Sequence, residues 1–125
     1  MGFEHVATRT MDLDAAIRFY ELLGMKVSRR IELEKNRASL AYLEPPEGNF
    51  RIELVYNWGK DEPYEGGKRF GHFGFGVPDV HEVYERLLAN GAGDVGRPPA
   101  PLQGTGSIIA FVADPDGNWI ELIQR

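Results

Sequence analysis

Residues 50–59 read FRIELVYNWG, and residues 118–125 read NWIELIQR. Both stretches are rich in the β-branched, aliphatic and aromatic residues that favour buried strands, yet each has a glutamate at its centre, Glu53 or Glu121. A single glutamate in such a run is more often solvent-facing on an exposed strand face. Two of them in the same Ile-Glu-Leu setting indicate that the chain contains one structural unit twice.

The repeat extends through both halves of the chain. A shift of 68 residues superposes the two Ile-Glu-Leu segments, and a shift of 67 superposes the segments that precede them. The one-residue difference is what a single insertion in a loop would produce. The pairs that coincide under the shift of 67 are His5 and His72, Asp12 and Asp79, and Gly24 and Gly91.

Each half is expected to have the element order βαβββ. Apolar periodicity and turn residues in the first half predict strands over 2–10, 25–33, 38–44 and 50–57, and a helix over 15–23. The modules cover residues of about 1–59 and 70–125, with a charged loop over 60–69. Because 125 residues are the size of one ordinary domain, we expect a single α+β domain over residues 1–125. Its two tandem modules should form one curved mixed sheet with the helices outside.

Strand alternation predicts which side chains share a face, because residues two apart point the same way. If Glu53 points into the concave side, Ile52, Leu54 and Tyr56 can pack under the helix. The residues expected on the open face are Arg51, Val55 and Asn57 with Glu53, Arg9 with His5, and Gly74 and Gly76 with His72. Glycine at those two positions would leave room for a ligand.

Composition excludes several classes of function. The formal net charge is -5, which gives no basic excess for covering phosphates, so nucleic acid is not an expected partner. The chain has no cysteine, so a metal would have to be held by nitrogen and oxygen. No apolar run approaches the roughly 18 residues of a membrane span, and the first residues lack a signal-peptide pattern. A cytoplasmic location is therefore expected.

Two histidines and two glutamates at matched positions form a donor set for a divalent first-row metal, with other positions left to water or substrate. Taken singly, a strand histidine is more often a hydrogen-bonded structural residue, and a strand glutamate is more often solvent-facing. The matched repeat favours the metal site over those readings. His81, at a helix start without a counterpart, is expected at the surface.

Four segments carry a resemblance to a known family: EHVATR (4–9), IELVYNWG (52–59), GHFGFGVPDV (71–80) and AFVADPDGNWIELI (110–123). Together they resemble glyoxalase I (lactoylglutathione lyase), a family of the vicinal oxygen chelate superfamily, across nearly the whole chain. The closing motif is widespread in that superfamily, whereas the segment around Glu53 points more narrowly to glyoxalase I. The resemblance assigns the metal ligands to His5, Glu53, His72 and Glu121.

The resemblance implies isomerisation of the hemithioacetal of methylglyoxal and glutathione to S-D-lactoylglutathione. Glu121 would be the base that moves the proton, and Glu53 could serve from the opposite face. Alternatively, both glutamates remain ligands and water carries the proton.

Four residues are expected to bind the carboxylates of glutathione. By the resemblance, Arg9 and Asn57 contact the γ-glutamyl end, and Lys68 or Arg69 the glycyl carboxylate. Each of these cations could instead be solvated. The sequence departs from the family at PLQGTGS (101–107), where many relatives have a lysine near Gln103, so the identity of the thiol stays open.

The resemblance also implies a divalent metal and a homodimer with two shared sites. Zinc-activated forms often have longer loops than nickel- or cobalt-activated ones, and this compact chain favours nickel, with cobalt or zinc as alternatives.

Related functions differ at the position of Glu53. A methylmalonyl-CoA epimerase would have glutamine there, and an extradiol dioxygenase or fosfomycin-modifying enzyme needs only two histidines and one glutamate. A metal-free drug-binding protein of the bleomycin-resistance type shares the fold but has no use for four matched ligands. A lyase acting on another thiol or a larger ketoaldehyde fits the residues almost as well as glyoxalase I.

Overall fold

The computed structural model describes residues 1–125 and divides into two compact units, Met1–Glu65 and Gly66–Arg125. The boundary falls inside the loop predicted over 60–69. Each unit has its own hydrophobic core and its own sheet. That the two units together make one domain stays a prediction.

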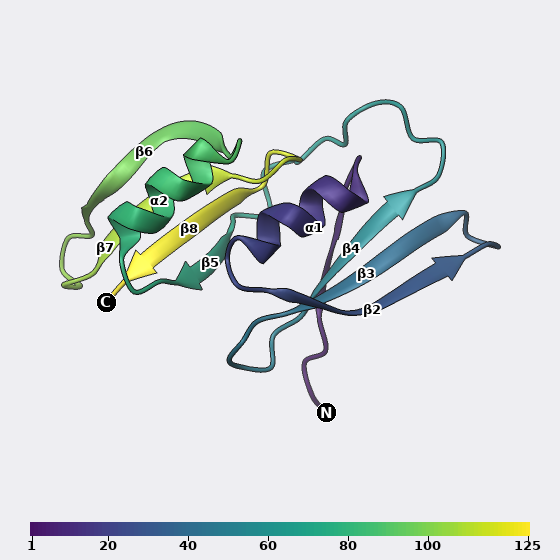
Figure 1. Ribbon diagram of the computed structural model, residues 1–125, viewed down its shortest axis with the longest axis horizontal. Helices are drawn as coiled ribbons and strands as arrows, with labels where there is room; N and C mark the ends of the chain where they lie inside the picture. The colour runs from purple at the N-terminus through teal and green to yellow at the C-terminus, as the bar shows by residue number, and fades with distance from the viewer. The chain divides into compact units, whose positions relative to one another are not determined.

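The first unit has the expected order βαβββ and forms a mixed sheet with strand order β1-β4-β3-β2. Strand β1 runs parallel to β4, and the other neighbours are antiparallel. Helix α1 packs on this sheet and contacts β2, β3 and β4 (Figure 1). The elements are β1 (Val6–Arg9), α1 (Leu13–Glu21), β2 (Lys26–Leu33), β3 (Ala38–Glu44) and β4 (Ile52–Asn57).

The second unit repeats this arrangement with strand order β5-β8-β7-β6 and a parallel β5–β8 pair. Helix α2 packs on β6, β7 and β8. The α+β class and the tandem βαβββ modules are thereby confirmed, whereas the joining of both sheets into one larger curved sheet stays a prediction. The elements are β5 (Phe73–Gly76), α2 (Val80–Ala89), β6 (Gly93–Pro101), β7 (Ile108–Ala113) and β8 (Trp119–Gln124).

The repeated aspartate and glycine fix the ends of the two helices. Asp12 caps α1 by accepting a hydrogen bond from the Ala15 backbone N–H at 3.0 Å, and Asp79 caps α2 in the same way. Gly24 and Gly91 have φ values of +88° and +93°, a left-handed conformation that glycine adopts without strain and that ends a helix. The acidic start and glycine stop read from the sequence are therefore confirmed.

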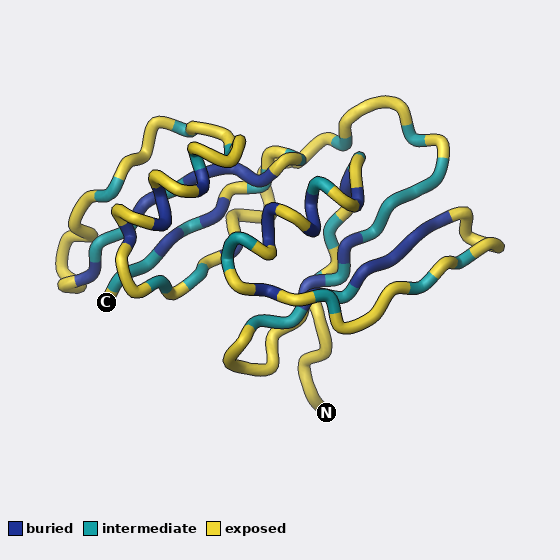
Figure 2. Tube along the Cα trace, in the orientation of Figure 1, coloured by how far each residue is buried: buried dark blue, intermediate teal, exposed yellow.

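The core of each unit lies between the helix and one face of the sheet. Ile52 and Leu54 of β4, and Ile120 and Leu122 of β8, are 0 to 1% exposed, as strand alternation predicted. Figure 2 shows buried positions alternating with exposed ones along both helices. The glutamate between each pair of buried residues must therefore point to the opposite face of its sheet.

The first strand is shorter than predicted. β1 covers Val6–Arg9 rather than residues 2–10, because its only partner is β4 and the pairing begins where the Val6 N–H bonds the Arg51 carbonyl. His5 consequently lies one residue before the strand, and His72 lies one residue before β5.

Strand β6 includes Pro98 and Pro99, which normally argue against a strand. Both prolines are tolerated because β6 is an edge strand that pairs only with β7. The register of this pairing is irregular at two places. None of the helices is long and apolar enough to cross a membrane. The expected cytoplasmic location stays a prediction.

Candidate active site

The first unit brings His5 and Glu53 together. The parallel pairing of β1 with β4 sets Ala7 beside Glu53, and His5, two residues before Ala7, points to the same face. The His5 Nε2 atom lies 3.3 Å from a carboxylate oxygen of Glu53. Two residues separated by 48 positions in the sequence thus meet through one strand pair.

The second unit makes the same pair from equivalent positions. Gly74 of β5 lies beside Glu121 of β8, and the His72 Nε2 atom lies 3.5 Å from a Glu121 carboxylate oxygen. The side chains of Glu53 and Glu121 are 14% and 18% exposed, while the histidines are more accessible. Both carboxylates are therefore shielded but remain reachable from solvent.

An aromatic residue, Tyr42, lies beside the His5–Glu53 pair. Tyr42 of β3 is the register partner of Glu53, and its ring meets His5 edge-on with centroids 5.5 Å apart. The hydrogen bond between the Tyr42 hydroxyl and Glu53, followed by burial, raises the pKa of Tyr42 above its usual value. The phenol therefore stays protonated and can donate to the carboxylate.

The donor atoms of both pairs fit a divalent metal. Two ligands on one ion, with bonds near 2.0–2.1 Å, stand roughly 3 Å apart, close to the 3.3 and 3.5 Å separations within the pairs. Imidazole nitrogen with carboxylate oxygen suits first-row divalent metals. Neither unit by itself gathers three or more such side chains, so a four-ligand site requires both pairs.

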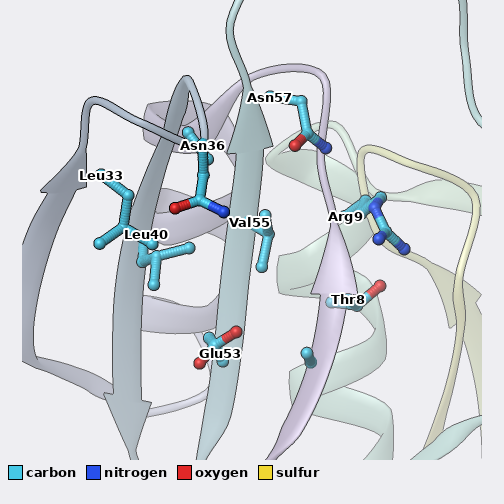
Figure 3. A pocket seen from close by; sticks show the side chains of 10 residues that line it. Thr8, Arg9, Leu33, Asn36, Leu40, Glu53, Val55 and Asn57 are labelled. Atoms are coloured by element: carbon cyan, nitrogen blue, oxygen red, sulfur yellow. The ribbon is translucent and has the colours of Figure 1, made fainter.

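A cavity of about 300 Å³ opens beside Glu53 in the first unit, on the sheet face away from α1. Figure 3 shows Glu53 at one end, with Arg9 and Asn57 toward the other and Leu33 and Leu40 along one side. Its size is at the lower limit for small-molecule sites. The lining residues are Ala7, Thr8, Arg9, Leu33, Asn36, Ala38, Leu40, Glu53, Val55 and Asn57.

The predicted binding residues Arg9 and Asn57 both line this cavity, as strand alternation required. The Asn57 side-chain amide donates to the Tyr64 hydroxyl at 2.7 Å, which holds its orientation. The Tyr64 ring in turn carries the Lys60 ammonium 4.6 Å from its centroid. Arg51, expected on the same face, lies just before β4 and pairs with Glu44 at 2.6 Å.

Lys68 and Arg69 are exposed on the irregular segment before β5, in the second unit. Their predicted contact with a glycyl carboxylate stays a prediction. His81 is exposed in the first turn of α2, as expected for a surface residue.

Comparison with known proteins identifies the family. The model of the glyoxalase/bleomycin resistance protein/dioxygenase superfamily matches residues 2–122. The chain belongs to this superfamily.

Relatives within the glyoxalase superfamily include lactoylglutathione lyases from bacteria and plants. The chain is 43% identical to the enzyme of Haemophilus influenzae over 100% of its own length and 93% of the relative's. It is 46% identical to the enzyme of Arabidopsis thaliana over 98% of its own length, yet spans only 44% of that protein. The trypanothione-dependent glyoxalase I of Leishmania major aligns with a TM-score of 0.81 and 32% identity, covering 99% of this chain and 86% of that one.

Sequence reasoning missed two residues of this glyoxalase-superfamily site. Asn36 lines the cavity from the turn between β2 and β3, a position that strand alternation cannot assign. Tyr42 lies in the strand predicted over 38–44, whose side chains were not assigned to a face of the sheet. Its antiparallel pairing with β4 places it opposite Glu53, and a register search between the two predicted strands could have found it.

Proposed function

We propose that this protein is a metal-dependent lactoylglutathione lyase that isomerises the hemithioacetal of methylglyoxal and glutathione to S-D-lactoylglutathione. The observation that carries the proposal is the pair of His–Glu contacts, at 3.3 and 3.5 Å, on equivalent positions of the two modules. Relatives named lactoylglutathione lyase along the full chain support the choice of reaction.

His5, Glu53, His72 and Glu121 would hold one divalent metal. Such an ion supplies Lewis acidity to the adjacent oxygens of the substrate. Nickel is the proposed metal because the short loops within the two modules resemble the nickel- and cobalt-activated forms of the family. Cobalt and zinc are the alternatives, since ligand identity does not distinguish them.

The chain's own residues supply the proton transfer. Glu121 removes the proton from the carbon bonded to sulfur and delivers it to the neighbouring carbon, while the hydroxyl proton passes from the first oxygen to the second. The product is a thioester with a secondary alcohol, so no oxidant or reductant is consumed. Glu53, on the equivalent position of the other module, is the second candidate for the base.

The cavity beside Glu53 would bind the thiol part of the substrate. Arg9 and Asn57 offer donors for the α-carboxylate of the γ-glutamyl group, and Leu33 and Leu40 offer apolar contact. Lys68 or Arg69 would bind the glycyl carboxylate. A homodimer in which each site takes one module from each chain completes the proposal.

The test is thioester formation from methylglyoxal and glutathione by metal-stripped protein resupplied with nickel, cobalt, manganese or zinc. We expect turnover with at least one metal, nickel most strongly, and none without metal. Glu121→Gln should retain its metal and lose turnover by at least a hundredfold, the range attributed to general bases.

Three results would contradict parts of the proposal. If the protein binds a metal but forms no thioester with any of the four, the proposed substrate is wrong and other thiols should be assayed. Full turnover by a metal-loaded Glu121→Gln variant would discard the assignment of the base. A monomer in sedimentation analysis of the active protein would discard the shared sites.

A further inference from the structure

The two modules differ by one hydroxyl at equivalent places beside their glutamates. Tyr42 is the antiparallel register partner of Glu53, and Phe111 is the partner of Glu121. Both rings meet the histidine of their own pair edge-on, with centroids 5.5 Å apart for His5 and 5.2 Å for His72. The ring and histidine are therefore arranged alike in both modules, although Phe111 also packs against Trp119 with centroids 5.5 Å apart. Only the first module has a hydrogen-bond donor on the ring.

That donor faces the carboxylate, because Tyr42 and Glu53 are directly opposite on β3 and β4. Hydrogen bonding to Glu53 is the first cause that raises the pKa of Tyr42, whereas the phenyl ring of Phe111 can offer Glu121 only apolar contact. The neighbours on the other side of the two glutamates also differ. Ala7 of β1 lies beside Glu53, and the smaller Gly74 of β5 lies beside Glu121. Glu53 thus has a hydrogen-bond donor on one neighbouring strand and a methyl group on the other, and Glu121 has neither.

We propose that Tyr42 is a positioning residue that fixes Glu53 as a permanent metal ligand, and that Phe111 leaves Glu121 free to act as the mobile base. This inference rests on the proposed function and deepens it by stating why the two matched glutamates have different roles. It concerns residues of this chain outside the four proposed ligands.

The physical reason is orientation. A carboxylate that binds a metal through one oxygen is commonly held by a hydrogen bond to the other, and loss of such a partner weakens metal binding or activity. If Glu53 turned away from its ligand position, it would also have to break the bond from Tyr42. Glu121 can turn between substrate carbon atoms without breaking any bond to its ring neighbour.

The first test compares metal affinity in three proteins, each stripped of metal and titrated with nickel against a chelator of known affinity. Tyr42→Phe should raise the Kd for nickel by roughly tenfold or more, the effect expected for loss of a ligand's supporting hydrogen bond. Tyr56→Phe is the matched control, because it removes a hydroxyl from β4 on the opposite face to Glu53. Its Kd should match that of the wild type.

The second test adds the hydroxyl to the other module. Phe111→Tyr should lower kcat by roughly tenfold while leaving KM and the Kd for nickel no weaker than in the wild type, because the base, not the metal, becomes restrained. A substitution that only disturbed packing would instead lower the melting temperature of the metal-free protein. This temperature is therefore measured for every variant.

The outcomes separate the two proposals. A Kd within twofold of the wild type for Tyr42→Phe, or an unchanged kcat for Phe111→Tyr, would overturn the inference. If the wild type binds nickel but makes no thioester, the proposed reaction fails, and the Kd of Tyr42→Phe still decides whether Tyr42 positions Glu53.

Discussion

Glu121 has free space on its β5 side because its neighbour there is Gly74. A Cβ atom added at Gly74 would lie 3.6 Å from a Glu121 carboxylate oxygen and 3.5 Å from an Ile123 methyl, which are ordinary contact distances. Gly74 also lacks the left-handed conformation that would strain alanine. Alanine should therefore fit the fold while it reduces the freedom of the carboxylate.

We predict that Gly74→Ala lowers kcat for thioester formation on the order of tenfold, because small errors in the placement of a catalytic group are costly. The free energy of unfolding should stay within about 1 kcal/mol of the wild type. Steady-state kinetics and urea unfolding measure the two effects. Gly66→Ala, where the added methyl meets nothing within 4 Å, is the matched control. Equal kinetics for both variants would refute a mobile Glu121.

Tyr84 should make the free energy of unfolding depend on pH in the alkaline range. Burial of Tyr84, a residue of α2, followed by the nearby charges of Asp94 and Glu85, raises the pKa of its hydroxyl above the ordinary value of 10.0. A raised pKa means that the unfolded chain loses this proton first as pH increases. The free energy of unfolding should therefore be unaffected by Tyr84 below about pH 9 and fall as pH rises through 10.

The measurement is urea unfolding of wild type and Tyr84→Phe at several pH values between about 8 and 11. We expect the Tyr84→Phe curve to fall less steeply above pH 10, because that variant has no proton to lose there. Parallel curves over the whole range would show that Tyr84 does not contribute to the alkaline loss.

Individual site residues were predictable to different degrees. Strand alternation and the repeat singled out His5, Glu53, His72 and Glu121 as one set and put Arg9 and Asn57 on the open face. They did not predict that each unit joins its own histidine to its own glutamate. The same rules could not find Asn36, because turns have no fixed period. The hydroxyl of Tyr42 became informative only when the register of β3 against β4 was known.

The turn between β7 and β8 sets the position of Glu121. Asp114 is a buried residue, 4% exposed, and its carboxylate accepts hydrogen bonds from the backbone N–H groups of Asp116 and Asn118 at 2.9 and 2.8 Å. It also accepts one at 2.9 Å from the side-chain amide of Asn118. Gly117, with φ of +89°, closes the turn so that β8 returns antiparallel to β7.

We predict that Asp114→Ala lowers the free energy of unfolding by about 2–3 kcal/mol, because several charge-assisted hydrogen bonds are lost at a buried site. Asp114→Asn keeps one acceptor oxygen and should lose less than half as much. Chemical denaturation of both variants provides the comparison. Equal losses would show that the turn needs both carboxylate oxygens of Asp114, and that a side chain of the same shape with one acceptor does not hold it.

Elements with strong local signals were predicted well, and edge elements were not. Helix α1 agrees with the predicted range 15–23 to within two residues, because Asp12 and Gly24 are start and stop signals with local physical causes. Asp79 and Gly91 mark the ends of α2 in the same way. The length of β1 depends on where a distant strand begins to pair with it. Strand β6 forms although it contains prolines, because an edge strand pairs on one side only and needs fewer backbone donors.

The proposed metal site would stabilise both units, because each supplies two of its ligands. A ligand that binds only the folded state at 100 times its Kd adds about 2.7 kcal/mol to the free energy of unfolding. We predict a higher melting temperature with nickel than with chelator, and no such difference for His5→Ala or His72→Ala. A nickel shift that persists in either variant would contradict a site built from both pairs.

The repeat predicts how many metal ions bind per chain. Each unit supplies one histidine and one glutamate, and neither gathers a third such group. If the pairs combine, whether within a chain or across a dimer, the number of metal ions equals the number of chains. If each pair binds separately, the number doubles.

The most direct test of the account is therefore the rate of thioester formation from methylglyoxal and glutathione during titration of metal-stripped protein with nickel. We predict a rate that starts at zero, rises in proportion to added nickel, and reaches its plateau at one ion per chain. A rate that does not depend on metal, or a plateau reached only at two ions per chain, would contradict a single site made by both His–Glu pairs.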